Sequence, residues 1–568
     1  MCQLVITAQE CLDLVSVCNP LLTYERNLAG GEGRLKERVP SDTSETAVRI
    51  EGQQQIGFIA YINPSNDNAW TDLINYDPEK LSVLVVNPLN GPDSSYNQEW
   101  GNVISRAKAS KKTVIGYVQT GYLGLAEPNE FGDHRTRLGS LELSDWVAQI
   151  EEDVDRWFSL YGSDIDGIFF DEGWNLCGLK DDSTTQIADI YAYIDRYVKL
   201  RYPGTFTVLN PGTPVPQCYE HTMDTLVTFE GPFDKPDVLV DYANNYTDIK
   251  WVPQDIRKLW HIVYEVSEAN IERAVQLAKE RNVGLLHITD DLGGTGQNPY
   301  DSVPNAAYMN KLLAAVEGGI PLREEKSWPE GATAATPESL TRVALDYTSV
   351  KLKWSPALNA LGYQVYIGNT VNVSVPAEMT EVTIGGLSPG TTYDFSVTAI
   401  GGKGEESQHS PSMSATTLEL PNGQPIGEYS STVSDTSTVV RADVYVPYSF
   451  TRVYFWDTVN CPAETSESAY PVSKDGTIPP VYVCARYRVE DGKLWHFIGK
   501  PPYPPPGAVQ WQWEVTAENL DVKRDGYTYT WNVPIGWSNF DTSKFAVQVE
   551  GYGPRTTVFE PTPVAPSK

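Results

Sequence analysis

The stretch DGIFFDEG, residues 166–173, places a strongly apolar run directly before two adjacent carboxylates, Asp171 and Glu172. Short apolar runs bounded by turn residues are typical of interior strands of a parallel sheet, because such strands are buried on both faces. Ionised carboxylates are costly to bury without a partner. The change from apolar to acidic therefore indicates either a strand that ends at a wet cleft or an internal ion pair.

Similar apolar runs, rich in Val, Ile, Phe and Tyr, recur between residues 56 and 291. They are IGFIAYINP (56–64), LSVLVVNP (81–88), TVIGYVQTGY (113–122), FTVLNPG (206–212), TLVTFEG (225–231), LWHIVYEV (259–266) and VGLLHITDD (283–291). Segments such as 143–162 and 270–282 separate them and have apolar residues three and four apart, as in amphipathic helices. Eight strands alternating with helices over about 250 residues predict a (β/α)8 TIM barrel. We place it at residues 54–318, after a poorly defined N-terminal extension at 1–53.

The pattern changes after a polar linker at residues 319–333, which contains Pro and Gly. In residues 334–417, alternating apolar residues such as Val350, Leu352 and Trp354 share one face of a strand. Trp354 is suited to be a core tryptophan, and LSPGTTY (387–393) resembles a tyrosine corner. The segment is therefore predicted to be a fibronectin type III sandwich.

Residues 418–568 remain β-like. Asp491-Gly492 and Asp525-Gly526 are hairpin signals, and six of the fifteen tryptophans of the chain lie in this segment. Trp511 and Trp513 are two apart on one strand, so they are either core residues or a stacking platform for sugar rings. We expect a folded β-rich module, with carbohydrate binding as its candidate role.

Charge and hydropathy exclude several function classes. The net charge of −31 argues against nucleic acids and anionic membrane surfaces as partners, and leaves a neutral or cationic ligand. No uninterrupted apolar window approaches the roughly 18 residues of a transmembrane helix. The N-terminal stretch MCQLVITAQECLDLVSVC lacks a basic region and contains Glu10 and Asp13, which departs from a secretory signal.

The cysteines do not indicate a metal site. Seven are present, without CxxC or zinc-finger spacing, so we expect no structural zinc. Two pairs, Cys177 with Cys218 and Cys461 with Cys484, are either disulfides or buried free thiols, and spacing does not decide between these alternatives. We expect no metal and no cofactor.

The ends of the apolar runs supply the candidate site residues, because TIM-barrel active sites lie at the carboxyl ends of the strands. In chain order they are Tyr61, Asn63, Asn87, Tyr117, Thr120, Tyr122, Asp171, Glu172, Asn210, Glu230, Tyr264, Asp290 and Asp291. A polar, acidic and aromatic rim suits a polyhydroxylated ligand. Each of the three asparagines precedes a proline, so each is either a turn-forming residue or a ligand contact. We expect the Asp290-Asp291 pair to lie at the periphery of the site.

Asp171, Glu172 and Glu230 differ from the rest because each follows a strongly apolar strand. Two carboxyl groups across a cleft are what cleavage of a glycosidic bond requires, one as an acid and one as a nucleophile or base. Adjacent residues of a strand point in opposite directions, so the sequence does not decide between Asp171 and Glu172. The chain has no GxSxG, HExxH or glycine-rich phosphate loop, and only six histidines.

The barrel motifs resemble the spherulin-4-like family, glycoside hydrolase family 135. The resemblance extends over residues 54–317, through AYINPSNDNAW, VVNPLNGP, TVIGYVQTGYLG, DIDGIFFDEG, LNPG, TLVTFEG, ITDD and NPYD (298–301). It implies an endo-acting glycosidase of fungal type that cleaves α-1,4-linked N-acetylgalactosamine in galactosaminogalactan. It also implies Asp171 as nucleophile, Glu230 as acid/base and Glu172 as the residue that orients its neighbour.

The resemblance implies an extracellular or cell-wall location, and we expect a monomer whose partner is polysaccharide. The first alternative is a non-catalytic wall or matrix protein that binds polysaccharide. A second is a metal-dependent deacetylase that uses the Asp-Glu pair, for which the sequence offers no histidine ligands.

Overall fold

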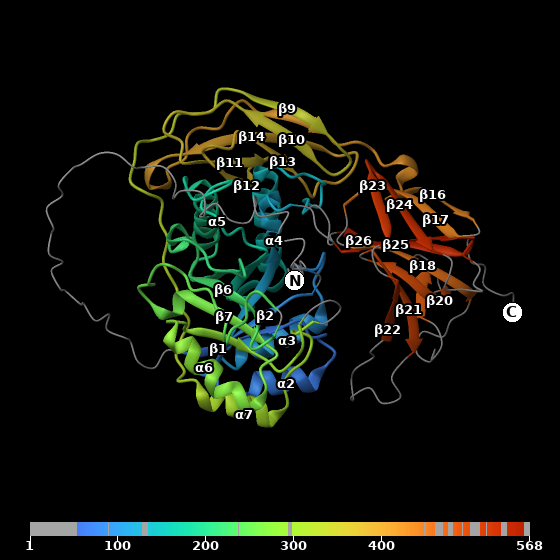
Figure 1. The fold of residues 1–568 in the computed structure, drawn as a ribbon. Coiled ribbons are helices and arrows are strands. Elements are labelled where there is room, and N and C mark those ends of the chain that lie inside the picture. Colours follow the sequence, from blue (N-terminus) through green and yellow to red (C-terminus); the bar gives the residue numbers. More distant parts are fainter. Residues whose placement is uncertain are drawn as a thin grey trace, which may run out of the picture.

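The computed structural model describes residues 54–88, 90–127, 134–236, 238–293, 298–434, 436–447, 450–459, 470–474, 481–490, 492–499, 512–517, 520–534, 542–551 and 553–561. Within these ranges, no helix has both the length and the apolar character needed to cross a membrane. The described residues form a parallel barrel, a two-sheet domain beside it and a second pair of sheets further along the chain (Figure 1).

Eight parallel strands close into a barrel in sequence order, which confirms the predicted TIM barrel. They are β1 (Gln55–Ala60), β2 (Leu81–Val86), β3 (Thr113–Gln119), β4 (Gly167–Asp171), β5 (Phe206–Leu209), β6 (Thr225–Pro232), β7 (Leu259–Tyr264) and β8 (Leu285–Ile288). Each strand lies within one of the eight apolar runs or extends beyond it by a single residue. Side chains that include Ile59, Ile115, Phe169, Val208 and Trp260 fill the barrel interior.

Helices cover the barrel, but not after every strand. They are α2 (Asp67–Asn75), α3 (Gln98–Ala109), α4 (Leu143–Tyr161), α5 (Gln186–Arg201), α6 (Ile271–Glu280) and α7 (Ala306–Ala315). The connections after β5 and β6 contain only the 3₁₀ turns η4 (Gln217–Tyr219) and η5 (Ile256–Lys258) in their described parts. The expectation of helical segments throughout is thus wrong for these two connections. Their prolines, among them Pro214, Pro216 and Pro253, disfavour helix because proline lacks the N–H group.

The next domain is the predicted fibronectin type III sandwich. Its strands are β9 (Leu340–Leu345), β10 (Val350–Trp354), β11 (Gly362–Ile367), β12 (Thr370–Pro376), β13 (Glu381–Ile384), β14 (Thr392–Ile400) and β15 (Met413–Thr416), in the sheets β13-β10-β9 and β12-β11-β14-β15. Trp354 is buried in the core. The tyrosine corner is present, since the backbone N–H of Ser388 donates to the Tyr393 hydroxyl at 2.9 Å.

The C-terminal module is formed by two further sheets. Its strands are β16 (Ile426–Val433), β17 (Ser437–Val444), β18 (Phe450–Val459), β19 (Tyr470–Lys474), β20 (Val481–Glu490), β21 (Lys493–Gly499), β22 (Gln512–Ala517), β23 (Asp521–Asp525), β24 (Thr528–Pro534), β25 (Phe545–Gly551) and β26 (Gly553–Glu560). Residues of both sheets, including Val440, Trp531, Phe455 and Val547, share one apolar core. The hairpin predicted at Asp525-Gly526 joins β23 to β24.

The tryptophan platform proposed for this module is only partly visible. Trp511 lies outside the described residues, as do Asp491 and Cys461. The ring of Trp513 is half-buried and lies 5.3 Å from Tyr470 and 5.2 Å from Phe497, centroid to centroid. Trp513 is therefore at least partly a packing residue of the outer apolar cluster on this sheet.

The segment predicted as a linker is bound to the barrel. The backbone N–H of Glu324 donates to Asp224 at 2.6 Å, and the Glu324 carboxylate pairs with Lys258 at 2.7 Å. Lys199 donates to the Glu324 carbonyl oxygen. Burial of Asp224, Lys199 and Lys258 makes these contacts less screened than surface ion pairs. The connection to the fibronectin domain is therefore held against the barrel surface.

Candidate active site

The carboxyl end of β4 brings Asp171 to the barrel mouth. Asp171 follows Phe169 by two residues, and Phe169 points into the barrel interior. Side chains alternate between the faces of a strand, so Asp171 shares the interior-facing side. The Tyr117 hydroxyl donates to Asp171 Oδ2 at 2.9 Å, and the Asn210 amide donates to Oδ1 at 2.7 Å.

Glu172 lies just beyond the end of β4, where strand alternation no longer applies. Its φ of 57° is in the left-handed region, which is uncommon for a residue other than glycine. Its Oε2 accepts a hydrogen bond from Gln119 Nε2 at 2.8 Å. Because Gln119 is the last residue of β3 and pairs in register with Asp171, Glu172 stays at the same end of the barrel.

A β-bulge in β6 directs Glu230 into the barrel. The register against β7 shifts between Val227 and Phe229, so Val227 pairs with Trp260 and Glu230 pairs with Ile262. Val227, Trp260 and Ile262 are all interior residues. Uninterrupted alternation from Val227 would have placed Glu230, three residues later, on the outer side. Bulges commonly redirect a side chain next to an active site in this way.

One amide joins the two carboxylates. Asn210 Nδ2 donates to Asp171 Oδ1 at 2.7 Å and to Glu230 Oε2 at 2.9 Å. These two acceptor oxygens therefore lie no more than 5.6 Å apart, the sum of the two distances. The Tyr300 hydroxyl donates to the other oxygen of Glu230. Each carboxylate thus accepts one hydrogen bond from Asn210 and one from a tyrosine.

Burial and mutual repulsion change the protonation of this group. Burial, followed by the charge of Glu230, raises the pKa of Asp171 to about 7, although the Tyr117 hydrogen bond opposes the shift. Burial also raises the pKa of Glu172, against the hydrogen bond from Gln119. Burial, then Asp171 and Glu230, raise the pKa of Tyr61 well above its usual value, and burial raises the pKa of Tyr117 and Tyr300 in the same way. The three phenols therefore stay neutral, and those of Tyr117 and Tyr300 donate to the carboxylates. Perturbed pKa values of this kind cluster at functional sites.

The tyrosines form an aromatic wall next to the carboxylates. The ring centroid of Tyr61 lies 5.8 Å from that of Tyr117 and 5.4 Å from that of Tyr300, both edge to face. Tyr264, at the end of β7, is buried, and the charges of Glu230 and Glu265 add to the rise that burial causes in its pKa. Tyr61 and Tyr264 are thus both close enough to Glu230 for its charge to raise their pKa values.

The remaining predicted residues lie in turns or at the rim. Asn63 is exposed, and its side-chain oxygen accepts from the Ser65 backbone at 2.9 Å. Asn87 accepts from the Gly91 backbone at 3.0 Å within its own loop. Both contacts favour the interpretation that these two asparagines stabilise turns. Asp290 is exposed, and Asp291 accepts from Ser302 Oγ at 2.7 Å, so this pair stays at the periphery.

Thr120 and Tyr122 support the backbone of the carboxylates. Thr120 is buried, and its hydroxyl donates to the carbonyl oxygens of Asp171 at 2.8 Å and Glu172 at 2.7 Å. The backbone N–H of Tyr122 donates to the Glu172 carbonyl oxygen at 2.7 Å. These two residues were predicted as ligand contacts. The hydrogen bonds show that they also hold the end of β4 in place.

Tyr300 and Gln119 are site residues that the run-end argument missed. Tyr300 belongs to the loop before α7 rather than to a strand end, and it reaches the site because its carbonyl oxygen accepts from the Tyr61 backbone at 2.9 Å. The available signal was the NPYD motif at 298–301. Gln119 directly precedes Thr120 on the third run but is not among the predicted residues.

A disulfide closes the loops next to the site. Cys177, after β4, is bonded to Cys218 in η4, at a sequence separation of 41. This decides in favour of the disulfide for the first of the two cysteine pairs. Cys484 is disulfide-bonded as well. No group of three or more His, Cys, Asp or Glu side chains suited to a metal ion occurs among the residues that the structure describes.

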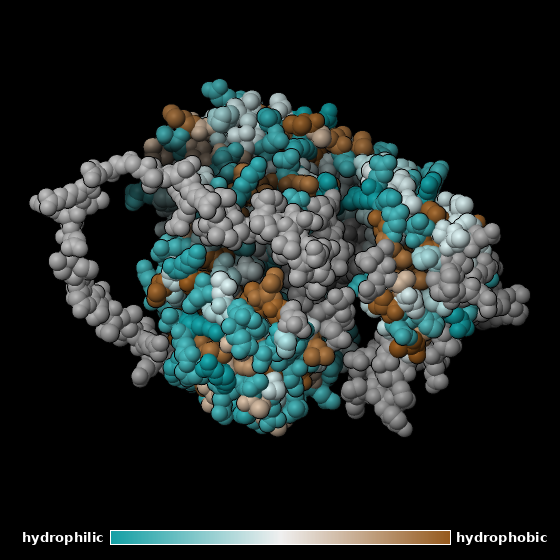
Figure 2. Space-filling model, in the orientation of Figure 1, coloured by the Kyte–Doolittle hydropathy of each residue, from teal (hydrophilic) through white to brown (hydrophobic). Residues whose placement is uncertain are grey.

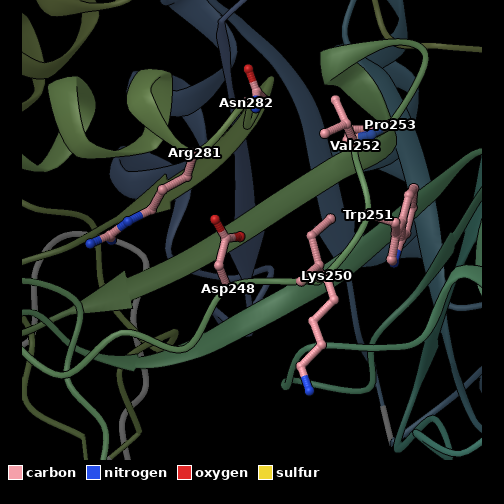
Figure 3. Close-up of a pocket in the computed structure, with 8 residues that line it drawn as sticks. Asp248, Lys250, Trp251, Val252, Pro253, Arg281 and Asn282 are labelled. Atoms are coloured by element: carbon pink, nitrogen blue, oxygen red, sulfur yellow. The ribbon is translucent and has the colours of Figure 1, made fainter. Parts of the chain in front are cut away.

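Two cavities lie away from the carboxylates. One, of about 310 Å³, is lined by residues 248–253 of the β6–β7 connection together with Arg281 and Asn282 (Figure 3). Figure 3 shows the Arg281 and Lys250 side chains extending in different directions, with Asp248 between them. The other, of about 340 Å³, lies between α4 and the fibronectin domain. Neither is lined by Asp171, Glu172 or Glu230, so we place the chemistry at the strand ends instead.

The surface around the barrel is mostly hydrophilic in the view of Figure 2, with apolar patches that are small and scattered. A surface of this kind agrees with the acidic composition of the chain.

Comparison with known proteins agrees with this architecture. Residues 55–316 match the family described as spherulation-specific family 4, and residues 335–416 match the fibronectin type III domain. A poly(3-hydroxybutyrate) depolymerase from Ralstonia pickettii is 40% identical over 124 residues, which are 22% of this chain and 25% of the depolymerase. The chain thus spans about a quarter of that curated relative.

Two solved structures illustrate the structural matches. Aspergillus clavatus Sph3 in complex with GalNAc matches with a TM-score of 0.34 and 18% identity, over 46% of this chain and 98% of that one. Chitinase ChiA74 from Bacillus thuringiensis matches with a TM-score of 0.27 and 9% identity, over 85% of this chain and 98% of that one. From the sequence matches, the chain carries a barrel of spherulation-specific family 4 at residues 55–316, joined to a fibronectin type III domain at residues 335–416.

Proposed function

We propose that this protein is a retaining, endo-acting glycoside hydrolase that cleaves a polysaccharide. The observation that carries the proposal is the single Asn210 amide nitrogen that binds both Asp171 and Glu230. Retaining glycosidases place their two carboxyl groups about 5–5.5 Å apart, whereas inverting enzymes separate them by about 6.5–9.5 Å to admit a water molecule. The upper limit of 5.6 Å between the two bridged oxygens fits the retaining arrangement.

Asp171 is the proposed nucleophile and Glu230 the proposed acid/base. Burial and the charge of Glu230 raise the pKa of Asp171 to about 7, so a proton is available at this site near neutral pH. In the reactive form this proton lies on Glu230, which donates it to the leaving oxygen, while ionised Asp171 attacks the anomeric carbon. Glu230 then removes a proton from the water that hydrolyses the glycosyl ester. Tyr117 and Tyr300 stabilise whichever carboxylate is charged at each step.

The proposed substrate is α-1,4-linked N-acetylgalactosamine or galactosamine in a galactosaminogalactan-type polymer. The linkage and sugar follow from the resemblance of the barrel motifs. The chemistry of the site supports the class of ligand, because tyrosine rings can cover the apolar faces of a sugar and carboxylates can bind hydroxyl or ammonium groups. The negative net charge of −31 favours a neutral or cationic polymer over an anionic one. We also propose an extracellular or cell-wall location and carbohydrate binding by the C-terminal module.

The test is incubation of the full chain with partly deacetylated galactosaminogalactan, followed by mass analysis of the products. The full chain is used because one apolar core continues from the barrel helices into the fibronectin domain. Shortened oligosaccharides with new reducing ends are expected. Glu230→Gln should abolish their release while polymer binding persists, whereas Glu272→Gln, on the exposed surface of α6, should leave the release unchanged. Polymer that stays intact with the wild-type protein would refute the glycosidase.

The same experiment separates the two alternatives. A non-catalytic polysaccharide-binding protein retains the polymer in both the wild-type and Glu230→Gln forms and releases nothing. A metal-dependent deacetylase releases acetate without shortening the chain, and loses this activity when a chelator is added.

A further inference from the structure

The turn after β3 has an unusual backbone. In the 3₁₀ turn η2 (Gly121–Gly124), four successive residues are left-handed, with φ of 54° at Gly121, 51° at Tyr122, 54° at Leu123 and 72° at Gly124. Glycine adopts this conformation readily, but Tyr122 and Leu123 do not. Such a conformation persists only where the surrounding structure holds it in place.

This turn holds the backbone of the proposed catalytic residues. The N–H groups of Thr120 and Tyr122 donate to the carbonyl oxygens of Asp171 at 2.9 Å and Glu172 at 2.7 Å. The Thr120 hydroxyl donates to both carbonyls as well. Because the backbone at Asp171 sets the direction of its side chain, these contacts help to fix the carboxylate.

The turn is held in place by Trp146 of α4. The Trp146 side chain is buried, and its ring lies so close to Gly121 that a Cβ there would come within 2.2 Å of it. A Cβ on Gly124 would meet the same indole at 3.0 Å and the Leu141 carbonyl oxygen at 2.8 Å. The position of Trp146 therefore fixes the turn, and the position of α4 fixes Trp146.

The fibronectin domain is hydrogen-bonded to the first turns of α4. Asp145, adjacent to Trp146, is buried and accepts two hydrogen bonds from Thr383 of β13, from the backbone N–H at 2.7 Å and from Oγ1 at 3.0 Å. Further along the helix, buried Glu151 accepts from the Ser374 backbone of β12 at 2.7 Å. Figure 1 shows β12 and β13 lying against α4.

We propose that the fibronectin type III domain is a positioning element of the active site rather than a spacer. Thr383 fixes Asp145 and the start of α4, Trp146 closes on the left-handed turn, and the turn holds the backbone of Asp171 and Glu172. Thr383, Asp145 and Trp146 are positioning residues, since they act through the turn. The effect on turnover rests on the proposed glycosidase activity, but the mechanical coupling does not.

The test compares two threonines of the same domain in the full chain. Thr383→Val removes the Oγ1 bond to the barrel, whereas Thr392→Val removes a bond of 2.8 Å to Thr416 within the fibronectin domain itself. Amide hydrogen exchange is followed at Thr120 and Tyr122. We expect exchange at both amides to rise at least about two-fold in Thr383→Val and roughly ten-fold in Asp145→Ala, as weakened tertiary contacts increase local opening. Thr392→Val should leave these amides unchanged.

Turnover gives the second readout. Thr383→Val and Asp145→Ala should lower kcat on the polymer with little change in KM, since the residues that contact sugar remain in place. Unchanged exchange at Thr120 and Tyr122 in both interface variants overturns the coupling, whatever the activity. If the wild-type protein cleaves no polymer but the exchange effect is present, the coupling stands and the proposed function fails.

Discussion

Replacement of Asp171 by Asn should make the barrel less sensitive to rising pH while abolishing activity. The carboxyl is buried beside Glu230, and its pKa is raised from 3.8 to about 7. In the folded state Asp171 therefore keeps its proton to higher pH than in the unfolded state. Its stabilising contribution is fully present below the unfolded pKa and is lost as pH rises through about 7.

The size of the effect follows from the shift. A difference of about three pKa units corresponds to about 4 kcal/mol of lost stability at high pH, of which about 2.5 kcal/mol falls between pH 5 and pH 8. The amide that replaces the carboxyl carries no charge, so this loss disappears in the variant. The free energy of unfolding of Asp171→Asn relative to wild type should thus rise by about 2.5 kcal/mol from pH 5 to pH 8. At a single pH, the difference in unfolding free energy between the variant and wild type also includes a cost of about 1–3 kcal/mol where the new amide nitrogen faces Asn210 without a partner.

The measurement is the melting temperature of the barrel transition at pH 5 and pH 8. The variant should gain roughly 5–10 °C relative to wild type across this interval. Asp72→Asn, an exposed change on α2, serves as the matched control and should track the wild type. Parallel pH dependence of wild type and Asp171→Asn would show that Asp171 titrates normally, and would contradict the raised pKa of this carboxyl.

Three further outcomes are expected. Asn210→Ala should lower kcat roughly 10²-fold with a small change in KM, measured by reducing-end release, because the two carboxylates lose their shared donor; a loss in KM alone would contradict the bridging role. Tyr300→Phe removes a donor to Glu230 and should lower kcat roughly 10-fold in reducing-end release, since the charged carboxylate loses one of its two donors; an unchanged kcat counts against the contact. Replacing Cys177 and Cys218 by Ser should lower the free energy of unfolding by about 2–4 kcal/mol in denaturant titration, and equal stability with and without reductant would argue that the bond is not formed.

Much of the barrel could be predicted because its signal is local. Each strand is a short apolar run, and runs such as 166–173 end on polar residues where the buried strand meets the mouth of the barrel. The expected helices after β5 and β6 are absent from the described parts of these connections, because prolines there disfavour helix despite the general alternation of strand and helix. The fibronectin domain was predicted from Trp354 and the Tyr393 corner, which are local features as well.

The carboxylates, Asn210 and Tyr117 of the candidate site were predictable from the sequence, but Tyr300, Gln119 and the arrangement of the group were not. Alternation along β4 is enough to place Asp171 beside Phe169 on the inner side. Glu230 reaches that side only through the bulge in β6, and Glu172 stays near the mouth only through a left-handed backbone at a residue that is not glycine. Both depend on neighbouring strands that stabilise an irregular backbone, which no single-residue preference reveals.

The sequence by itself determined the order of apolar and polar segments, and with it the barrel, the sandwich that follows and the acidic, aromatic character of the strand ends. Only the tertiary structure decided that Asn210 binds both carboxylates, that Tyr300 faces Glu230 and that the fibronectin domain is hydrogen-bonded to α4. Periodicity records which side chains are buried, because burial depends on position along a strand or helix. Contacts between segments far apart in the chain depend on register, bulges and docking, which are set when the layers pack together.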